Sequence, residues 1–192
     1  MGWRRTKLAG VASADPPAVT PLGAVRKRLA LLPPDVQRSL AVRLARLTLP
    51  LAALTSEAQP AGGLAAIAEH IRTDAGLVKI DAARHTLYGL PELLEDDEPQ
   101  GAAWYTFGAC IAWIYAADAL TTASTDGVVN ALSRVADLLD AMDSDLGDTA
   151  LHEGLVAAFD HAVPSSEDFS SLKRDVEASV HRLQAVLQTS SN

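Results

Sequence analysis

Apolar residues recur along this chain at intervals of three and four positions. Between residues 22 and 47 the pattern is interrupted once, at Pro33-Pro34. Side chains three and four positions apart lie on one face of a helix, and a proline inside such a pattern ends the helix. The sequence therefore predicts two amphipathic helices here, over about residues 22–32 and 36–47, and the second ends before Pro50.

The next part of the chain predicts a loop and two shorter helices. The loop is expected from Thr55 to Gly63, where Gly62-Gly63 joins two helices. Apolar residues at helical spacing then indicate one helix over about 64–71 and another over about 80–87. An acidic turn follows, over residues 92–98.

Residues 101–124 are the most apolar stretch of the chain. No charged residue occurs between Glu98 and Asp118, and large apolar side chains fall on every side of the predicted helix. A helix that is apolar all round is typical of the middle of a bundle. A membrane span fits less well, because the flanks of this stretch are acidic and lack Lys or Arg anchors. We therefore expect a buried central helix.

The clearest amphipathic pattern lies in the last third of the chain. Apolar residues follow strict four- and three-residue spacing over 128–146, and Gly147 ends this helix. A further helical segment runs over about 148–159 and breaks at Pro164. The last helix is predicted over about 169–187, packed across the bundle.

These patterns predict an all-α protein. No stretch alternates apolar and polar residues as a strand would, and Ala and Leu outnumber the residues that favour strands. A chain of 192 residues fits one domain. We expect a single irregular bundle of six or seven helices over residues 20–192, with a central apolar helix at about 101–124 and a disordered basic N-terminus at 1–19.

Charge is distributed unevenly along the chain. Residues 1–47 carry nine basic and two acidic residues, a net charge of +7, whereas the remainder carries −15 and the whole chain −8. The basic segment can dock on the acidic body of the protein itself, or on an anionic membrane or a nucleic acid. The sequence pI of about 5.0 disfavours nucleic acid as the main partner. Docking on the protein's own body is the favoured interpretation.

The carboxylates form two clusters that predict a binding surface for a basic protein. One is the acidic turn, and the other is the end of the helix predicted over 128–146. A helix C-terminus disfavours carboxylates, because the helix dipole is negative there, so the second cluster needs another explanation, such as a cationic partner. The predicted partner-binding residues are Glu92, Glu95, Asp96, Asp97, Glu98, Asp140, Asp143, Asp145 and Asp148.

Aromatic residues of the central helix suggest an alternative site. They either form the bundle core or line a ligand pocket between helices, with a polar anchor from a neighbouring residue. The core is the favoured interpretation, because aromatic residues at helical spacing usually pack inside a bundle. The residues of the alternative pocket are His85, Trp104, Tyr105, Trp113, Tyr115 and Asp118.

Residues suited to catalysis or metal binding do not fall into a recognisable pattern. The five histidines are scattered, and none stands at zinc-ligand spacing with another ligand type. Asp143 does not begin an EF-hand loop, because Asp148 stands where glycine is needed and Gly154 where a bidentate glutamate is needed. We therefore predict no metal and no cofactor, and we favour a non-enzymatic role. An enzyme built from dispersed residues stays open.

The single cysteine, Cys110, bears on compartment and packing. It excludes an internal disulfide and fits a reducing environment, so we expect a cytoplasmic protein. It lies in an apolar run with no His, Lys or Arg beside it to activate the thiol. We predict that Cys110 fills the core.

The order of segments from residue 22 to 146 resembles a group of bacterial proteins. The run from Leu29 to Pro50, the acidic turn, and the aromatic helix with Ala116-Ala117-Asp118-Ala119-Leu120 carry this likeness. It is to uncharacterised all-helical bacterial proteins of similar length, some of them grouped with immunity proteins of polymorphic toxin systems. The resemblance implies a small cytoplasmic protein that masks a protein partner without chemistry of its own.

The sequence thus leads to three functional hypotheses. The first is a non-enzymatic bundle that binds a basic protein through its acidic surface. The second is a small-molecule-binding regulator, or an enzyme, that uses the aromatic pocket. The third is association of residues 1–47 with an anionic membrane or a nucleic acid, which the charge of the remaining chain disfavours. Self-association into a homo-oligomer stays open.

Overall fold

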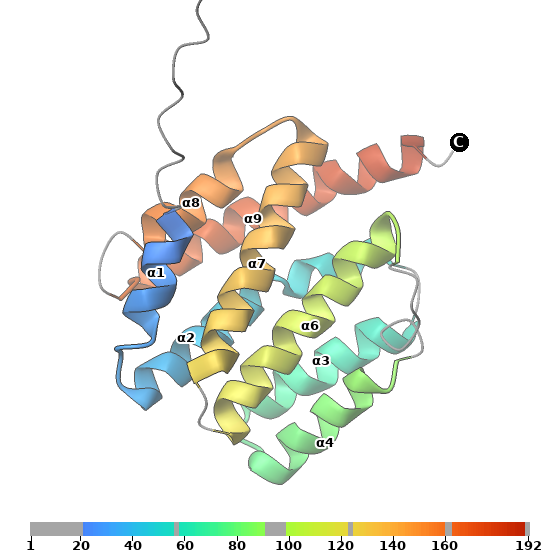
Figure 1. Ribbon diagram of the computed structural model, residues 1–192. Coiled ribbons are helices and arrows are strands. Elements are labelled where there is room, and N and C mark those ends of the chain that lie inside the picture. Colours follow the sequence, from blue (N-terminus) through green and yellow to red (C-terminus); the bar gives the residue numbers. More distant parts are fainter. Residues whose placement is uncertain (1–20, 56–57, 91–98, 123–124, 160–162, 191–192) are drawn as a thin grey trace, which may run out of the picture.

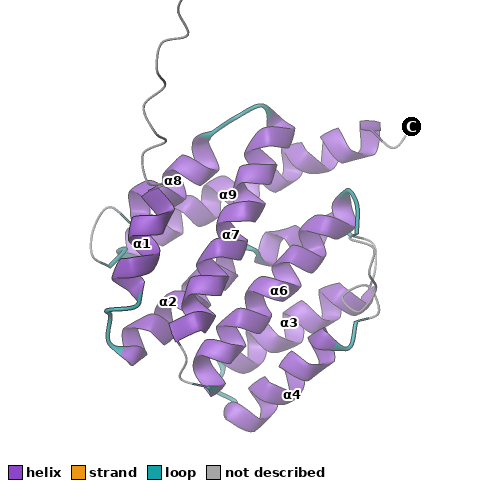
Figure 2. Cartoon of the chain, in the orientation of Figure 1, coloured by secondary structure: helices purple, strands orange, loops and turns teal. Residues whose placement is uncertain are grey.

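The computed structural model describes residues 21–55, 58–90, 99–122, 125–159 and 163–190. These residues form eight α-helices and one 3-10 helix, with no strand among them (Figures 1 and 2). The all-α prediction is confirmed, and the helix number exceeds the expected six or seven. The elements are α1 (Pro21–Leu29), α2 (Pro34–Leu47), η1 (Leu49–Leu54), α3 (Ala58–Arg72), α4 (Leu77–Tyr88), α6 (Ala102–Thr121), α7 (Thr125–Leu146), α8 (Ala150–Ala158) and α9 (Ser166–Ser190).

Prolines mark two of the boundaries between these helices. Pro33 separates the short α1 from α2, and Pro164 stands between α8 and α9. A proline in a helix interior removes a hydrogen bond and clashes with the preceding turn, so the chain forms separate short helices at these points. Both breaks were predicted, but the number of resulting helices was underestimated.

Helix α6 is the central helix of the bundle, as predicted. It packs against α7, α2, α4, α3 and η1, and Figure 1 shows it between α7 and the pair formed by α3 and α4. Twelve of its 20 residues are buried, among them Cys110, which is a core residue as expected. In the part of the chain that the structure describes, no helix combines the length and apolar character needed to cross a membrane.

Small residues bring α6 and α7 close together. A Cβ atom added at Gly127 would lie 2.7 Å from the backbone nitrogen of Ala119, too close for any side chain. One added at Gly108 would lie 2.6 Å from a methyl carbon of Leu138. Gly127 therefore permits an approach of the two helices that alanine would prevent, whereas alanine at Gly108 would require the Leu138 side chain to move.

Helix α3 begins earlier than the sequence predicted. The expected loop from Thr55 to Gly63 was wrong in its second half, because the helix starts at Ala58 and passes through both glycines. Pro60 lies in the first turn, where a proline costs no helical hydrogen bond. Gly63 has a packing role, since a Cβ atom there would lie 2.6 Å from a methyl carbon of Leu87 on α4.

Part of the basic N-terminal segment docks on the body of the protein. Helix α1 packs against α7, and the Arg28 guanidinium donates a hydrogen bond of 2.6 Å to the carbonyl oxygen of Phe159. The predicted disordered N-terminus, residues 1–19, lies outside the described residues. Helix α2 buries Leu40, Leu44 and Leu47 and carries arginines on its other sides.

The last helix crosses the bundle, as predicted. Helix α9 packs against α7, α8, η1 and α2. Its start is fixed by Ser165 and Asp168: the Asp168 amide donates to the Ser165 hydroxyl oxygen (3.1 Å), and the Ser165 amide donates to the Asp168 carboxylate (2.8 Å). This reciprocal cap places the first turns of α9 opposite α2.

Candidate functional site

The carboxylates at the end of α7 have partners inside the protein. Asp143 is buried, with 3% of its surface exposed. Its carboxylate accepts hydrogen bonds from the backbone amides of Leu151 (3.2 Å) and His152 (2.8 Å), in the first turn of α8. Unpaired amides at a helix start are satisfied by such an oxygen acceptor. Asp143 therefore holds α8 against the end of α7.

Asp145 and Asp148 are also engaged. The Tyr105 hydroxyl donates a 2.7 Å hydrogen bond to Asp145, and burial together with this carboxylate raises the pKa of Tyr105. Asp148 accepts from the amides of Thr149 (2.8 Å) and Ala150 (3.3 Å), which lower the pKa of its carboxyl. It also lies 3.5 Å from the guanidinium of Arg182 on α9.

The remaining members of the predicted acidic surface differ from these three. Asp140 is exposed and forms no ion pair with a residue that the structure describes. Glu92, Glu95, Asp96, Asp97 and Glu98 lie outside the described residues. The carboxylates near the C-terminus of α7 therefore have an explanation that the sequence did not give: they bind the next helix, a tyrosine and α9. Binding of a basic partner to this surface stays a prediction.

Two of the predicted aromatic pocket residues, Trp113 and Tyr115, border different hollows among those that the described residues line. The Trp104 ring meets Tyr105 edge-on at 5.1 Å, and the Arg134 guanidinium lies 5.1 Å from its centroid. Tyr115 borders a different, shallow hollow beside Asp137. Of the six predicted residues, Trp113 alone lines a groove between α2, α3 and α9.

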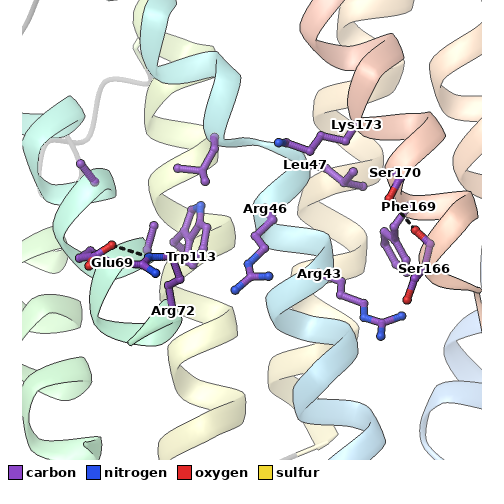
Figure 3. Close-up of a pocket in the computed structure, with 13 residues that line it drawn as sticks. Arg43, Arg46, Leu47, Glu69, Arg72, Trp113, Ser166, Phe169, Ser170 and Lys173 are labelled. Atoms are coloured by element: carbon purple, nitrogen blue, oxygen red, sulfur yellow. Dashed lines mark hydrogen bonds and ion pairs between the residues drawn. The ribbon is translucent and has the colours of Figure 1, made fainter. Parts of the chain in front are cut away.

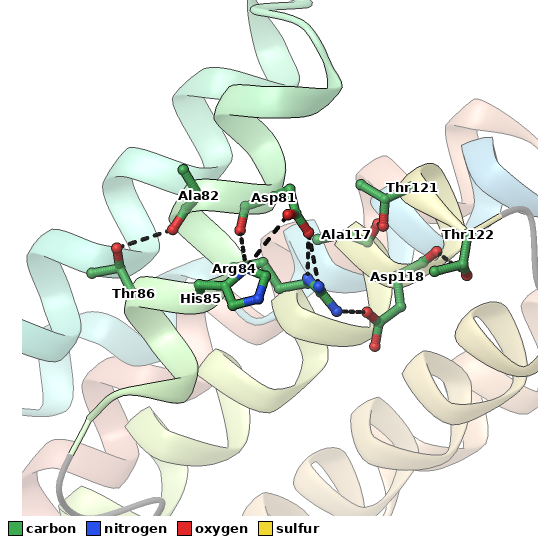
Figure 4. A network of polar contacts seen from close by, with 9 residues as sticks. All are labelled: Asp81, Ala82, Arg84, His85, Thr86, Ala117, Asp118, Thr121 and Thr122. Carbon is green, nitrogen blue, oxygen red and sulfur yellow. Dashed lines mark hydrogen bonds and ion pairs between the residues drawn. The ribbon is translucent and has the colours of Figure 1, made fainter.

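His85 and Asp118 belong to a polar network between α4 and α6 (Figure 4). The Arg84 guanidinium donates to Asp118 (2.5 Å) and to Asp81 (2.8 Å). Burial alone would lower the pKa of Arg84, but these two carboxylates outweigh it and raise the pKa. The His85 ring is exposed, with Nδ1 2.8 Å from the carbonyl oxygen of Asp81. This network joins two helices and pairs one oxygen of the Asp118 carboxylate with Arg84.

A groove of about 690 Å³ opens between α2, α3 and α9 (Figure 3). The three helices form its walls, and η1 and α6 contribute to its floor. Its size falls in the range of small-molecule sites. The described residues that line it are Arg43, Arg46, Leu47, Leu49, Ala65, Ala68, Glu69, Arg72, Trp113, Ser166, Phe169, Ser170 and Lys173.

Cations predominate among the charged side chains of this groove. Arg43 and Arg46 come from α2, Arg72 from α3 and Lys173 from α9, against the single carboxylate of Glu69. Because the two α2 residues are three positions apart, both project on the same side of that helix. Four cations from three separate helices thus line one open space, spread along it in the view of Figure 3.

The four cations differ in how far they are neutralised. Neither Arg43 nor Arg46 forms an ion pair within the described part of the chain, and the Arg43 guanidinium lies 5.9 Å from the Phe169 ring centroid. Lys173 lies 3.2 Å from Glu177 on its own helix. Arg72 makes two hydrogen bonds to Glu69, of 2.8 and 2.6 Å. Those bonds lower the pKa of Glu69 and raise that of Arg72.

Trp113 lies at the floor of the groove with an unused hydrogen-bond donor. The residue is 0% exposed, and its indole Nε1 has no hydrogen-bond partner among the described residues. A buried donor without a partner costs free energy, so such groups are rare in folded proteins. In the view of Figure 3 the Trp113 ring lies between the side chains of Arg72 and Arg46.

The first turns of α9 form one edge of the groove. Ser166, the first residue of α9, and Ser170 line it, and the Ser170 hydroxyl donates to the Ser166 carbonyl oxygen (2.7 Å). The amino end of a helix carries a partial positive charge and exposes amide donors. The same turn carries the carboxylates of Glu167 and Asp168, which offset this partial charge.

Sequence reasoning missed the groove as a site. Arg43 and Arg46 were recognised as part of a basic segment, and Trp113 as a candidate pocket residue. Their association with Arg72 and Lys173 was not predictable from spacing, because it depends on how α9 packs against α2 and how α3 packs on α6 and η1. The one local signal was the pair of arginines on an amphipathic helix.

In the described part of the chain, no three His, Cys, Asp or Glu side chains gather closely enough to hold a metal ion. Comparison of the chain with models of protein families, with curated proteins and with solved structures finds no match in any of the three. The function is therefore inferred from the side chains of this chain alone.

Proposed function

We propose that this protein is a binding protein that holds an anionic ligand in the cationic groove between α2, α3 and α9. The observation that carries this proposal is that Arg43, Arg46, Arg72 and Lys173 all line one open space, with a single carboxylate among the described lining residues. Like charges gathered at one place repel one another, and an anion would relieve that repulsion.

The lack of internal counterions supports a role in binding. Buried or half-buried cations that serve the fold are usually paired, as Arg84 is with Asp118 and Asp81. Arg43 is half-buried and has no such pairing within the described residues, and the exposed Arg46 beside it has none either. A groove with low-dielectric walls also concentrates the field of its charges, so an anion would be attracted even to a chain of net charge −8.

The test measures binding of pyrophosphate, a compact polyanion, to the full chain by isothermal titration calorimetry. We expect binding that weakens with salt and falls about 100-fold in the double variant Arg43→Gln/Arg46→Gln, because charge-assisted hydrogen bonds contribute roughly 1.5–3 kcal/mol each. The matched control is Arg26→Gln/Lys27→Gln, which removes two exposed cations from α1, away from the groove. Equal loss in both variants, or no binding at all, would contradict the proposal.

A basic protein partner is the second candidate, in line with the resemblance to immunity proteins. The observation that favours it is exposed Asp137 and Asp140, three positions apart on α7, on a chain whose residues 48–192 carry a net charge of −15. This hypothesis predicts a sub-micromolar complex that salt and the substitution Asp140→Lys weaken. A complex insensitive to both would argue against it.

A further inference from the structure

Helix α6 has one side that no described helix covers. Between residues 104 and 118, all but four of its residues are buried. The four are Trp104, Ile111, Tyr115 and Asp118, at intervals of seven, four and three positions, so they form one stripe along the helix. In the view of Figure 1, α6 and α7 lie in front, and no other described helix passes over them. The central helix of the bundle thus leaves an aromatic and apolar stripe at the surface.

Helix α4 borders the stripe on one side. Tyr88 is 43% exposed, and its ring centroid lies 5.7 Å from the Arg84 guanidinium. Burial, followed by the nearby groups of Asp118 and Tyr115, raises the pKa of Tyr88, so this residue lies beside the stripe. Arg84 itself is paired with Asp118 and with Asp81. Two tyrosines, one from α4 and one from α6, therefore reach the surface close to one another.

Helix α7 borders the stripe on the other side. The Arg134 guanidinium lies 5.1 Å from the Trp104 ring centroid, and its Nε is buried without a hydrogen-bond partner among the described residues. Asp137, three positions further along α7, is exposed and forms no ion pair with a described residue. These two α7 residues line a hollow of about 240 Å³ together with Ile111 and Tyr115. The hollow offers room for a side chain from outside, with apolar and charged groups around it.

The stripe and its two borders form a surface that we call the α6 face. Besides the stripe, it comprises Asp81, Arg84 and Tyr88 of α4 and Arg134 and Asp137 of α7. Its tryptophan, tyrosines and arginines are of the types enriched at the centres of protein interfaces. The stripe is about 21 Å long at 1.5 Å per residue, and three helices about 10 Å apart make the face about 30 Å wide. It therefore offers about 600 Å² to a partner, the lower limit for a specific interface.

The charges of the α6 face favour a second copy of the chain as the partner. Two arginines stand against three carboxylates, a net charge of −1, whereas the whole chain carries −8. Two acidic copies repel one another over much of their surface, but not where both signs of charge are present in near balance. A basic partner would gain more elsewhere on the chain, where carboxylates are in excess.

A two-fold axis at Ile111 makes the α6 face complementary to itself. In such a dimer α6 packs antiparallel on α6 of the second copy, and residues equally far from Ile111 on either side meet. Trp104 and Asp118 are each seven positions, about two helical turns, from Ile111, so Trp104 of one copy lies opposite Asp118 of the other. Arg134 lies over Trp104 and forms no ion pair with a described residue. It therefore approaches the Asp118 carboxylate of the second copy, of which only one oxygen is bound by Arg84.

We infer that the α6 face is a self-association surface that joins two copies of this chain, with α6 packed antiparallel on α6 around Ile111. Its small area is typical of a weak, reversible dimer. The α6 face does not depend on the proposed function, because Trp113 at the floor of the groove is two positions from Ile111 and projects from the opposite side of α6. The dimer therefore leaves the groove of each copy open.

Sedimentation velocity of the full chain at a series of micromolar concentrations tests the dimer. We expect a reversible monomer–dimer equilibrium, which Ile111→Arg should weaken at least tenfold because it brings two like charges together at the axis. Val78→Arg is the matched control, since it adds the same charge at a residue that is 85% exposed and lies six positions from Arg84, on another side of α4. A monomer at all concentrations, or a dimer that Ile111→Arg weakens no more than Val78→Arg does, would overturn the inference.

Ile111→Cys tests the position of the axis, and as a milder change it also decides the question if Ile111→Arg does not fold. At a two-fold axis the introduced thiols of two copies meet within the reach of a disulfide, so gentle oxidation should give a covalent dimer. The natural Cys110 is 0% exposed and contributes little background. Val78→Cys is the control and should cross-link at least tenfold more slowly. Equal rates would overturn the antiparallel arrangement and the inference with it.

Variants of the groove separate it from the α6 face. Arg43→Gln/Arg46→Gln should leave the monomer–dimer equilibrium unchanged, and Ile111→Arg should leave binding of pyrophosphate unchanged. If the dimer is lost in Arg43→Gln/Arg46→Gln instead, the two copies meet at the groove, and the assignment of the α6 face is wrong.

Discussion

The end of α7 and the groove beside α2 are both rich in charge, but they use it differently. At the end of α7, Asp143, Asp145 and Asp148 accept hydrogen bonds from α8, from Tyr105 and from Arg182 or nearby amides. In the groove, Arg43 and Arg46 have no charged partner within the described chain. A high density of charged side chains therefore does not identify a binding surface by itself. Charged side chains without a partner inside the protein are the better indication of one.

Asp143→Ala gives the largest expected effect on stability. The substitution leaves the amides of Leu151 and His152 without their acceptor at a site where water has little access. Loss of a helix-capping acceptor and burial of unpaired donors should lower the free energy of unfolding by about 2 kcal/mol. Urea unfolding at pH 7 measures it.

Asp143→Asn is the matched variant, because its amide oxygen can still accept one of the two bonds, and it should lose less. Binding of pyrophosphate in the groove should be the same in both variants. If Asp143→Ala were as stable as the parent, the carboxylate would not hold the fold and would again be free to serve a partner.

The sequence predicted the helices well because their signals are local. Apolar spacing located α2, α6, α7 and α9, and Gly147, with a φ of 65°, ends α7 as expected. The start of α3 was misjudged because Gly62-Gly63 suggests a loop locally, whereas the close contact of Gly63 with Leu87 depends on the packing of α4.

The sites were harder to predict than the fold. The acidic cluster was recognised, but its partners were not, because the approach of Tyr105 and Arg182 to α7 follows from tertiary packing. The groove was missed for the same reason, since Arg43 and Lys173 are distant in sequence. Residue type and spacing thus showed which residues are charged, and only the three-dimensional arrangement showed which of them are paired.

Tyr105→Phe should have the next largest effect on stability. It removes the hydrogen bond to Asp145, so the free energy of unfolding should fall by about 1 kcal/mol at pH 8. The folded-state pKa of Tyr105 is raised, by burial first and by Asp145 second. Its stabilising contribution is therefore complete below pH 10, the ordinary tyrosine pKa, and is lost as the pH rises further and the unfolded chain ionises.

The difference between the parent and Tyr105→Phe should accordingly shrink by about 1 kcal/mol between pH 9 and pH 11. Urea unfolding at both pH values measures it, with the other tyrosines common to the two proteins. A difference that stayed constant over this range would show that Tyr105 titrates normally and that its bond to Asp145 is weak.

Glu69→Gln tests the groove by removing its negative charge, whereas Arg43→Gln/Arg46→Gln removes two of its positive charges. Glu69 is the single carboxylate among the described groove residues, and it holds the Arg72 fork with two hydrogen bonds. Removing its charge should free Arg72 for a ligand and tighten binding of pyrophosphate about fivefold, because the negative charge of Glu69 no longer repels the anion. Weaker binding in calorimetry would mean that Glu69 positions Arg72 for the ligand and does not compete with it.

Asp140→Asn should have the smallest effect on the free energy of unfolding. For that reason it distinguishes the acidic end of α7 from the groove as a binding surface. Asp140 is exposed at the same end of α7 as Asp143, yet it forms no ion pair with a described residue. An exposed side chain without partners contributes little, so the free energy of unfolding should stay within about 0.5 kcal/mol of the parent, and pyrophosphate binding should not change. If a basic protein partner exists, its affinity should nevertheless fall, because Asp140 has no role in the fold that would occupy it. Unchanged stability with unchanged partner affinity would leave the acidic end of α7 as a purely structural region and the groove as the binding surface of the described chain.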